Sequence, residues 1–184
     1  MIGNGNIFSD SVSPFGAVIS LSIENSKVFE GVCYSLSRRL SIGGSAVVDI
    51  VFDPSASTDK NFIVFLPVTF KAYGAGPINI DLYVNPTYTG GAAMPFSNRD
   101  FTSQAASDVV WTLNPTVSDA GTLTPFQFII LSNGTAAVAS AGGEASENQV
   151  TNIDISKKYM FRLTNTEAAA VTGASIAATW FEVK

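Results

Sequence analysis

Hydrophobic and polar residues alternate along most of this chain with a period of two, which predicts β-strands. In the run 78–84, aliphatic side chains alternate with Asn79, Asp81 and Tyr83. Further alternating runs lie at 46–52, 159–163 and 174–183. No stretch shows a convincing helical period, and turn residues separate about eight to ten short strands. The pattern predicts an all-β fold, a two-sheet antiparallel β-sandwich or jelly roll.

One run is apolar on both faces. Residues 62–70 alternate between aromatic and aliphatic side chains without a polar face. Such a run is typical of a central strand, or of a strand covered by a second subunit. Pro67 argues instead for an edge strand or a bulge, because proline has no N–H to donate to a ladder.

The first 26 residues differ in character from the rest of the chain. They are rich in Gly, Asn and Ser, with scattered apolar residues, and predict an extended N-terminal arm. Residues 27–184 are predicted to form a single β-sandwich domain, since all-β sandwiches reach about 200–250 residues as one unit. Four apolar residues of the arm are candidate partner contacts: Ile2, Ile7, Phe8 and Phe15.

A near-repeat follows two of the predicted strands. Asn85-Pro86-Thr87 leads through glycine to Pro-Phe, and Asn114-Pro115-Thr116 does the same. The residue before proline leaves the right-handed helical region, proline ends a ladder, and glycine permits a turn. The copies therefore predict two equivalent corners of the β domain. Their tips are also candidate partner contacts, together with a nearby polar cluster: Asn85, Pro86, Thr87, Asn98, Arg99, Asn114, Pro115 and Thr116.

Composition narrows the classes of partner. Charged residues make up 14% of the chain, against about 25% in an average domain. The surface is therefore either rich in uncharged polar residues or buried against partners. A net charge of −5 argues against nucleic-acid binding, which needs a basic patch. No apolar run approaches a membrane span of about 20 residues, and no basic-then-apolar leader is visible, so we expect no membrane partner.

Catalytic chemistry finds little support. The chain has no histidine, which excludes Ser-His-Asp triads, Cys-His pairs and histidine-ligated metals. Acids such as Asp49, Asp81 and Asp108 could pair for glycoside hydrolysis only by chance. The loop from Asp53 to Asp59 lacks the ligand density of a calcium site. We expect no enzyme activity, no metal and no cofactor.

The single cysteine and the two tryptophans have simple interpretations. Cys33 has no intrachain disulfide partner and is expected to be a buried small hydrophobe. Trp111 and Trp180 lie in alternating runs and are expected in the core. The alternative for either tryptophan is stacking on a sugar ring.

Three passages resemble a group of small virion proteins of tailed bacteriophages. They are the stretch from Leu82 to Arg99, its echo from Asn114 to Leu123, and the ending from Ser156 to Thr166 with a final strand through Trp180. The resemblance covers about residues 30–184. It implies a jelly-roll structural protein on the exterior of the phage head, a decoration (cement) protein. Its partners would be the major capsid protein and copies of itself, with a trimer favoured.

A binding module is the alternative. The same scaffold could serve as part of a tail or head fibre that recognises host-surface carbohydrate. In that case Trp111, Tyr88 or Tyr73 would be exposed on one surface.

Overall fold

The computed structural model describes residue 30 and residues 32–56, 62–65, 68–72, 77–102, 105–130, 143–146 and 151–183. These residues form fifteen strands and no helix. The predicted N-terminal arm, with Ile2, Ile7, Phe8 and Phe15, lies outside the described residues, as does Tyr73.

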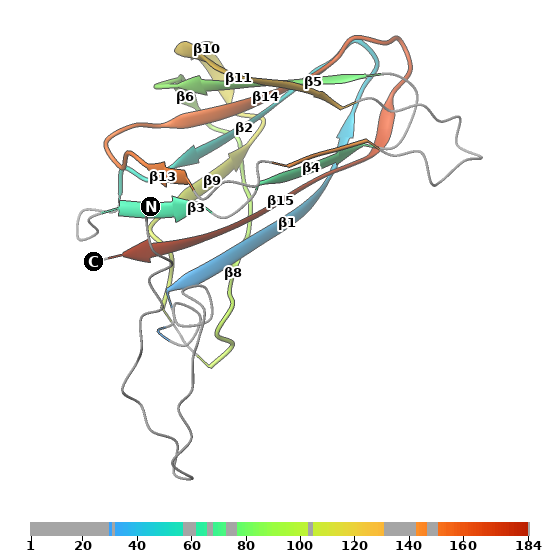
Figure 1. The fold of residues 1–184 in the computed structure, drawn as a ribbon. Coiled ribbons are helices and arrows are strands. Elements are labelled where there is room, and N and C mark those ends of the chain that lie inside the picture. The colour runs from blue at the N-terminus through green and yellow to red at the C-terminus, as the bar shows by residue number, and fades with distance from the viewer. Residues whose placement is uncertain are drawn as a thin grey trace, which may run out of the picture.

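The described residues form two large antiparallel sheets and a third sheet of two strands, β6 (Thr87–Thr89) and β10 (Thr116–Asp119) (Figure 1). The first has the strand order β12-β4-β15-β1-β8, and β3 pairs with both β15 and β13. Its members are β1 (Cys33–Ile42), β3 (Phe62–Phe65), β4 (Thr69–Ala72), β8 (Ser97–Asn98), β12 (Gly143–Ser146), β13 (Thr151–Ile153) and β15 (Val171–Val183). The run 62–70, expected to form one strand, is thus divided between β3 and β4, and Pro67 falls in the interval.

The second sheet has the order β11-β5-β14-β2-β9-β7. Its strands are β2 (Val47–Asp53), β5 (Ile78–Val84), β7 (Ala92–Ala93), β9 (Val110–Leu113), β11 (Thr122–Ile130) and β14 (Tyr159–Asn165). The prediction of an all-β fold with antiparallel sheets is therefore confirmed, and the two large sheets are consistent with a β-sandwich.

Alternation along the strands produces the core between the sheets. In β2, Val48, Ile50 and Phe52 face inward and are at most 5% exposed, whereas Asp49 and Asp53 face outward. Burying one large apolar side chain stabilises a fold by about 1.5–3 kcal/mol. Trp111 and Trp180 are 1% and 0% exposed with ring centroids 5.7 Å apart, so the prediction that both belong to the core is confirmed. Cys33 is also buried, as expected.

The near-repeat forms a third layer. β6 (Thr87–Thr89) comes from the first copy and β10 (Thr116–Asp119) from the second, and the two strands pair antiparallel. From β6 the chain continues to β7, which pairs with β9, the strand before the second copy. From β10 it continues to β11, which pairs with β5, the strand before the first copy. The copies are therefore equivalent corners that interlock, a connection the sequence did not reveal.

Both corners use the same backbone geometry. Asn85 and Asn114 have φ angles of 58° and 48°. Each donates its backbone N–H to a backbone carbonyl at 2.8 Å, Asn85 to Lys158 and Asn114 to Asp49. Both residues avoid the right-handed helical region, as expected before proline. They do so through positive φ, which asparagine tolerates better than most residues.

Candidate functional site

The two repeat copies meet on the outer face of the six-stranded sheet. We call residues 85–91 and 114–121 the repeat layer. Six of the predicted contact residues come together here: Asn85, Pro86, Thr87, Asn114, Pro115 and Thr116. The prolines are buried, whereas the asparagines and threonines are exposed. The layer thus anchors itself through proline and presents polar side chains.

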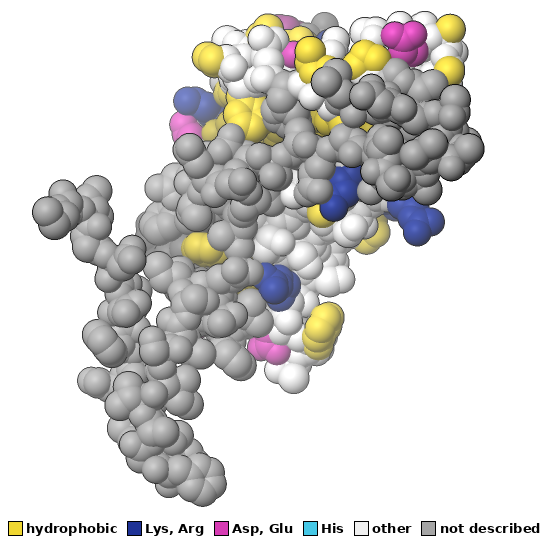
Figure 2. Space-filling view, turned by 45° about the vertical axis from the view of Figure 1, so that its right-hand side comes forward, with side chains coloured by type: hydrophobic (Ala, Val, Ile, Leu, Met, Phe, Trp, Pro, Cys, Tyr) yellow, Lys and Arg dark blue, Asp and Glu magenta, His cyan; other side chains and the backbone are white. Residues whose placement is uncertain are grey.

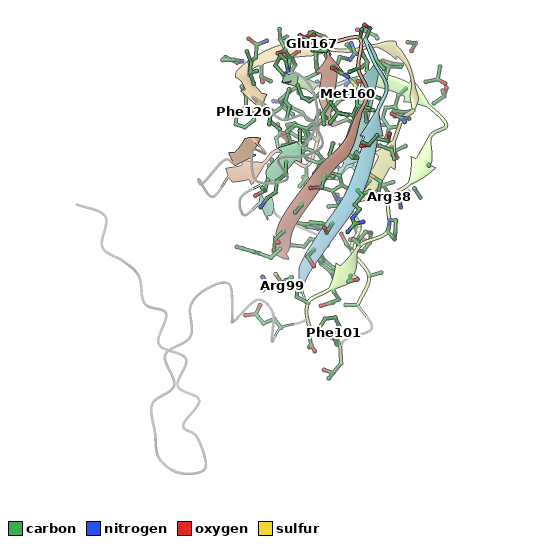
Figure 3. The ribbon with its side chains drawn as sticks, turned by 90° about the vertical axis from the view of Figure 1, so that its right-hand side faces the viewer. Arg38, Arg99, Phe101, Phe126, Met160 and Glu167 are labelled. Atoms are coloured by element: carbon green, nitrogen blue, oxygen red, sulfur yellow. The ribbon has the colours of Figure 1, made fainter. Side chains whose placement is uncertain are left out.

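Beneath the layer lies a small second core. Thr112, Val51, Met160 and Tyr83 are register neighbours on β9, β2, β14 and β5. Val51 and Met160 are 0% exposed although they face away from the main core. Figure 3 marks the position of Met160 among the strands. A Cβ placed on Gly91 would lie 2.5 Å from Thr112 Cγ2, so layer and sheet are in close contact. The layer is consequently a packed part of the fold.

A charged cluster ties the layer to β2 and to the chain before β14. Lys158 Nζ lies 3.0 Å from Asp53 Oδ2, and the Tyr88 hydroxyl donates to the same oxygen at 3.2 Å. The ammonium also stands 5.4 Å from the centroid of the Tyr88 ring. Burial and the neighbouring Asp53 carboxylate raise the pKa of Tyr88 to about 12. The phenol therefore stays protonated and continues to donate at physiological pH.

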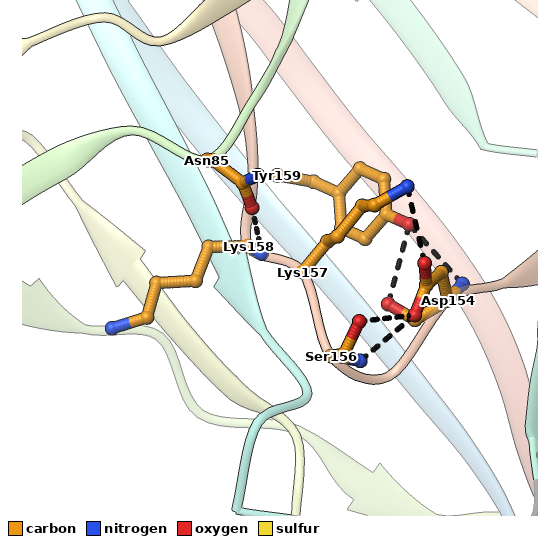
Figure 4. Close-up of polar contacts among 6 residues, drawn as sticks. All are labelled: Asn85, Asp154, Ser156, Lys157, Lys158 and Tyr159. Carbon is orange, nitrogen blue, oxygen red and sulfur yellow. Dashed lines mark hydrogen bonds and ion pairs between the residues drawn. The ribbon is translucent and has the colours of Figure 1, made fainter.

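The turn at residues 154–158 forms the other side of this cluster (Figure 4). Asp154 Oδ1 accepts from the backbone N–H of Ser156 at 3.0 Å and from its hydroxyl at 2.6 Å. Its other oxygen meets Lys157 Nζ at 3.1 Å. These hydrogen bonds, Ser156 first, lower the pKa of Asp154 to about 2. The backbone N–H of Lys158 then reaches Asn85 Oδ1 at 3.4 Å, which connects the turn to the first copy.

A polar pocket of about 320 Å³ opens between the first copy and this turn. Its lining is Asn85, Pro86, Thr87, Tyr88, Ser156 and Lys158. Three of the six, Asn85, Pro86 and Thr87, were singled out from the sequence. Tyr88 was named there only as part of the binding-module alternative. Ser156 and Lys158 were missed, because they come from a segment some seventy positions further along the chain.

An ion pair beside the layer was also missed. Arg162 binds Asp49 with both ends of its guanidinium, at 2.8 and 2.9 Å. Asp81 is its register neighbour on the other side, and Gln127 donates to Asp81 at 2.8 Å. The hydrogen bond with Asp49 is the main cause that raises the pKa of Arg162. Alternation placed Asp49 and Arg162 on outward faces, but only strand pairing could show that they meet.

Asn98 and Arg99 lie away from the repeat layer. Asn98 belongs to β8 of the seven-stranded sheet, where it pairs with Tyr34 of β1. The Arg99 backbone N–H donates to the Cys33 carbonyl at 2.8 Å. Figure 3 places Arg99 and Phe101 at the end of the molecule opposite Glu167. Phe101 is 88% exposed on this loop. The predicted contact residues thus belong to two separate regions.

The aromatic residues proposed for sugar stacking divide in the same way. Trp111 is buried, which removes it as a ligand-stacking residue. Tyr88 is half-buried and lines the pocket. Of the three aromatics named for a binding module, Tyr88 alone is both described and partly accessible.

In the part of the chain that the structure describes, no side chains are arranged as a calcium site or another metal site. Asp53 of the candidate calcium loop is engaged by Lys158, and Asp59 lies outside that part. No group of three or more Cys, Asp or Glu side chains there is placed to hold a metal. Among the same residues, no helix is long and apolar enough to cross a membrane.

Acid should weaken the tie between the layer and β2. Burial of Asp53 raises its pKa, but hydrogen bonds from Ser55 and contact with Lys158 outweigh burial and lower the pKa below 3.8. The resulting stability is complete above pH 3.8 and is lost as pH falls through the lowered pKa. Asp53→Asn should remove this part of the acid dependence, an effect of about 1 kcal/mol or less.

Urea unfolding at about pH 6 and about pH 3 measures that dependence. The exposed Glu167, changed to Gln, is the control, because its carboxylate lies at the far loop and away from Lys158. If Asp53→Asn loses as much stability on acidification as the wild type, Asp53 does not carry the effect.

Comparison with known proteins adds no relative. No protein-family model matches the chain, and no curated protein matches it.

Proposed function

We propose that the sandwich is a jelly roll and that the protein is a virion structural protein of a tailed bacteriophage. Its place would be the exterior of the head, as a decoration (cement) protein. The observation that carries the proposal is nested strand pairing. β1 pairs with β15, β2 with β14, β4 with β12, and β5 with β11. First-with-last nesting across two sheets is the topology of a doubled ribbon, which is how jelly rolls of viral capsid domains are built.

The repeat layer supports a structural role. It is inserted between β5 and β11, interlocks with both ends of one sheet and covers Val51 and Met160. An insertion fixed in this way holds its exposed asparagines and threonines in position at little entropic cost on binding. A rigid scaffold that presents surface loops is suited to repeated lattice contacts.

Surface charge is consistent with this role. In the coloured part of Figure 2, a few acidic and basic side chains lie among more numerous uncharged ones. A surface with few charges can be buried against a neighbour with little desolvation cost. We infer that the contact partners are the major capsid protein and further copies of this chain, with a trimer favoured.

The proposed mechanism is passive. Contacts that span adjacent capsid subunits bind the assembled shell and not the free subunit, so they stabilise the shell by mass action. The repeat layer and the N-terminal arm, through Ile2, Ile7, Phe8 and Phe15, would supply the contacts. An arm that orders on its partner meets that entropic cost at assembly.

Immunogold electron microscopy of intact virions tests the proposal. We expect gold distributed over the head, and purified protein that sediments with heads lacking it. Protein without residues 1–20 should sediment less while keeping the thermal unfolding of the full chain. Gold confined to the tail tip would overturn the head assignment, and equal sedimentation of the shortened chain would overturn the role of the arm.

A further inference from the structure

The pocket beside the first repeat copy has features of a ligand site. Its volume of about 320 Å³ is at the lower end of the 300–1,000 Å³ typical of small-molecule sites. Both of its walls are held in place. The Asn85 backbone N–H donates to the Lys158 carbonyl at 2.8 Å, and Ser156 is fixed by two hydrogen bonds to Asp154. The shape therefore does not depend on a ligand to form it.

Several polar groups in the pocket have capacity to spare. Within the described residues, neither Asn85 Nδ2 nor the Thr87 hydroxyl takes part in a hydrogen bond. The Lys158 ammonium carries three donors, and Asp53 engages it from one side. Figure 4 shows the Asn85 amide beside the backbone of Lys158, whose side chain extends away from the turn. The half-buried Tyr88 ring adds an apolar portion, and the buried Pro86 lies at the base of the lining. The lining thus combines hydrogen-bond donors, hydroxyls and one aromatic edge.

The charges at the pocket favour a neutral ligand over an anionic one. Lys158 is the only charged residue of the lining, and Asp53 already neutralises it at 3.0 Å. A carboxylate or phosphate would compete with Asp53 for that ammonium, whereas a neutral ligand leaves the ion pair intact. A polyhydroxylated neutral molecule matches both the hydroxyl and amide groups and the absence of net charge.

We propose that this pocket binds one unit of a neutral saccharide. The sugar hydroxyls would bond to Asn85 Nδ2, the Thr87 hydroxyl and Lys158, and the C–H face of the ring would pack on the half-buried Tyr88. The lectin domains that share this class of architecture fit such a use. Binding at one shallow site is weak, and several copies of the chain on one particle would raise it by multivalency. The inference does not rest on the virion role.

The pseudo-symmetry of the repeat provides a matched test. Asn85→Gly removes the side-chain amide and tolerates the positive φ of this position, and Thr87→Val removes the hydroxyl at nearly constant side-chain volume. Asn114→Gly together with Thr116→Val makes the same changes at the equivalent positions of the second copy, which do not line the pocket. Probes are glucose, galactose, mannose and N-acetylglucosamine, with glucuronic acid and N-acetylneuraminic acid for comparison. Chemical-shift titration by NMR reads binding and location together.

We expect at least one neutral sugar to shift Lys158, Tyr88 and Ser156 in the wild type at millimolar concentration. The pocket variant should bind about tenfold more weakly, as the loss of one to two hydrogen bonds implies, and the second-copy variant should bind like the wild type. Three results would overturn the proposal: no neutral sugar shifts these residues, both variants lose binding equally, or an acidic sugar binds more tightly than every neutral one.

Discussion

Replacing Gly121 by alanine is expected to lower the free energy of unfolding by roughly 3–5 kcal/mol. Gly121 has a φ of 81°, which is strained for a residue with a Cβ. An added Cβ would lie 2.2 Å from the Val84 carbonyl oxygen and 2.8 Å from the Asn85 carbonyl carbon and oxygen. These are backbone atoms, so no side chain can rotate away. The close approach exists because β11 starts directly against the end of β5.

Gly90 is the matched control for this substitution. Its φ of 64° is also positive, but a Cβ there meets nothing within 4 Å. Gly90→Ala should therefore cost only the backbone strain, about 1 kcal/mol. Urea unfolding of both variants measures the difference. If the two lose similar amounts of stability, the close packing of the corner is not what requires Gly121.

Saccharide binding at the proposed site should weaken in Gly121→Ala as well. The added Cβ would displace the carbonyl groups of Val84 and Asn85, and the Asn85 side chain lines the pocket. Gly90→Ala changes no group of the lining. The same pair of variants therefore also reports whether the corner geometry supports the pocket.

Trp180→Ala is expected to lower the free energy of unfolding by about 3–5 kcal/mol. The Trp180 side chain is fully buried and its ring packs against Tyr34, Phe96 and Trp111, at centroid distances of 5.8, 5.6 and 5.7 Å. Its indole N–H donates to Ser107 Oγ at 3.1 Å, and the Ser107 hydroxyl donates to the buried Glu182. Truncation would open a cavity between the sheets and remove a donor from this chain of hydrogen bonds.

Phe101→Ala serves as the control because it removes an aromatic ring that is 88% exposed. It should change stability by no more than about 0.5 kcal/mol. Trp180→Phe keeps most of the packing and should fall between the two. Thermal unfolding of the three variants checks the order. A loss below about 1 kcal/mol in Trp180→Ala would contradict the central place of this residue in the core.

The fold class could be predicted from the sequence because buried and exposed side chains alternate along a β-strand with a period of two. In β14, Tyr159, Phe161 and Leu163 are at most 9% exposed, and Arg162 faces outward, as the alternation indicated. The proline and glycine positions of the near-repeat likewise marked where strands end and turns begin. These signals are local, since each depends on a few neighbouring residues and their backbone preferences.

The tertiary structure alone decided which distant segments meet. Alternation places Asp49 and Arg162 on outward faces, but their ion pair requires that β2 lie beside β14. The two repeat copies looked like separate corners, and only the interlocked order of the six-stranded sheet makes β6 and β10 partners. The pocket has the same origin. The turn at 154–158 lies beside Asn85 because β14, which follows the turn, pairs with β5, which precedes Asn85. Strand order depends on the sum of many long-range contacts, so no short stretch of sequence carries it.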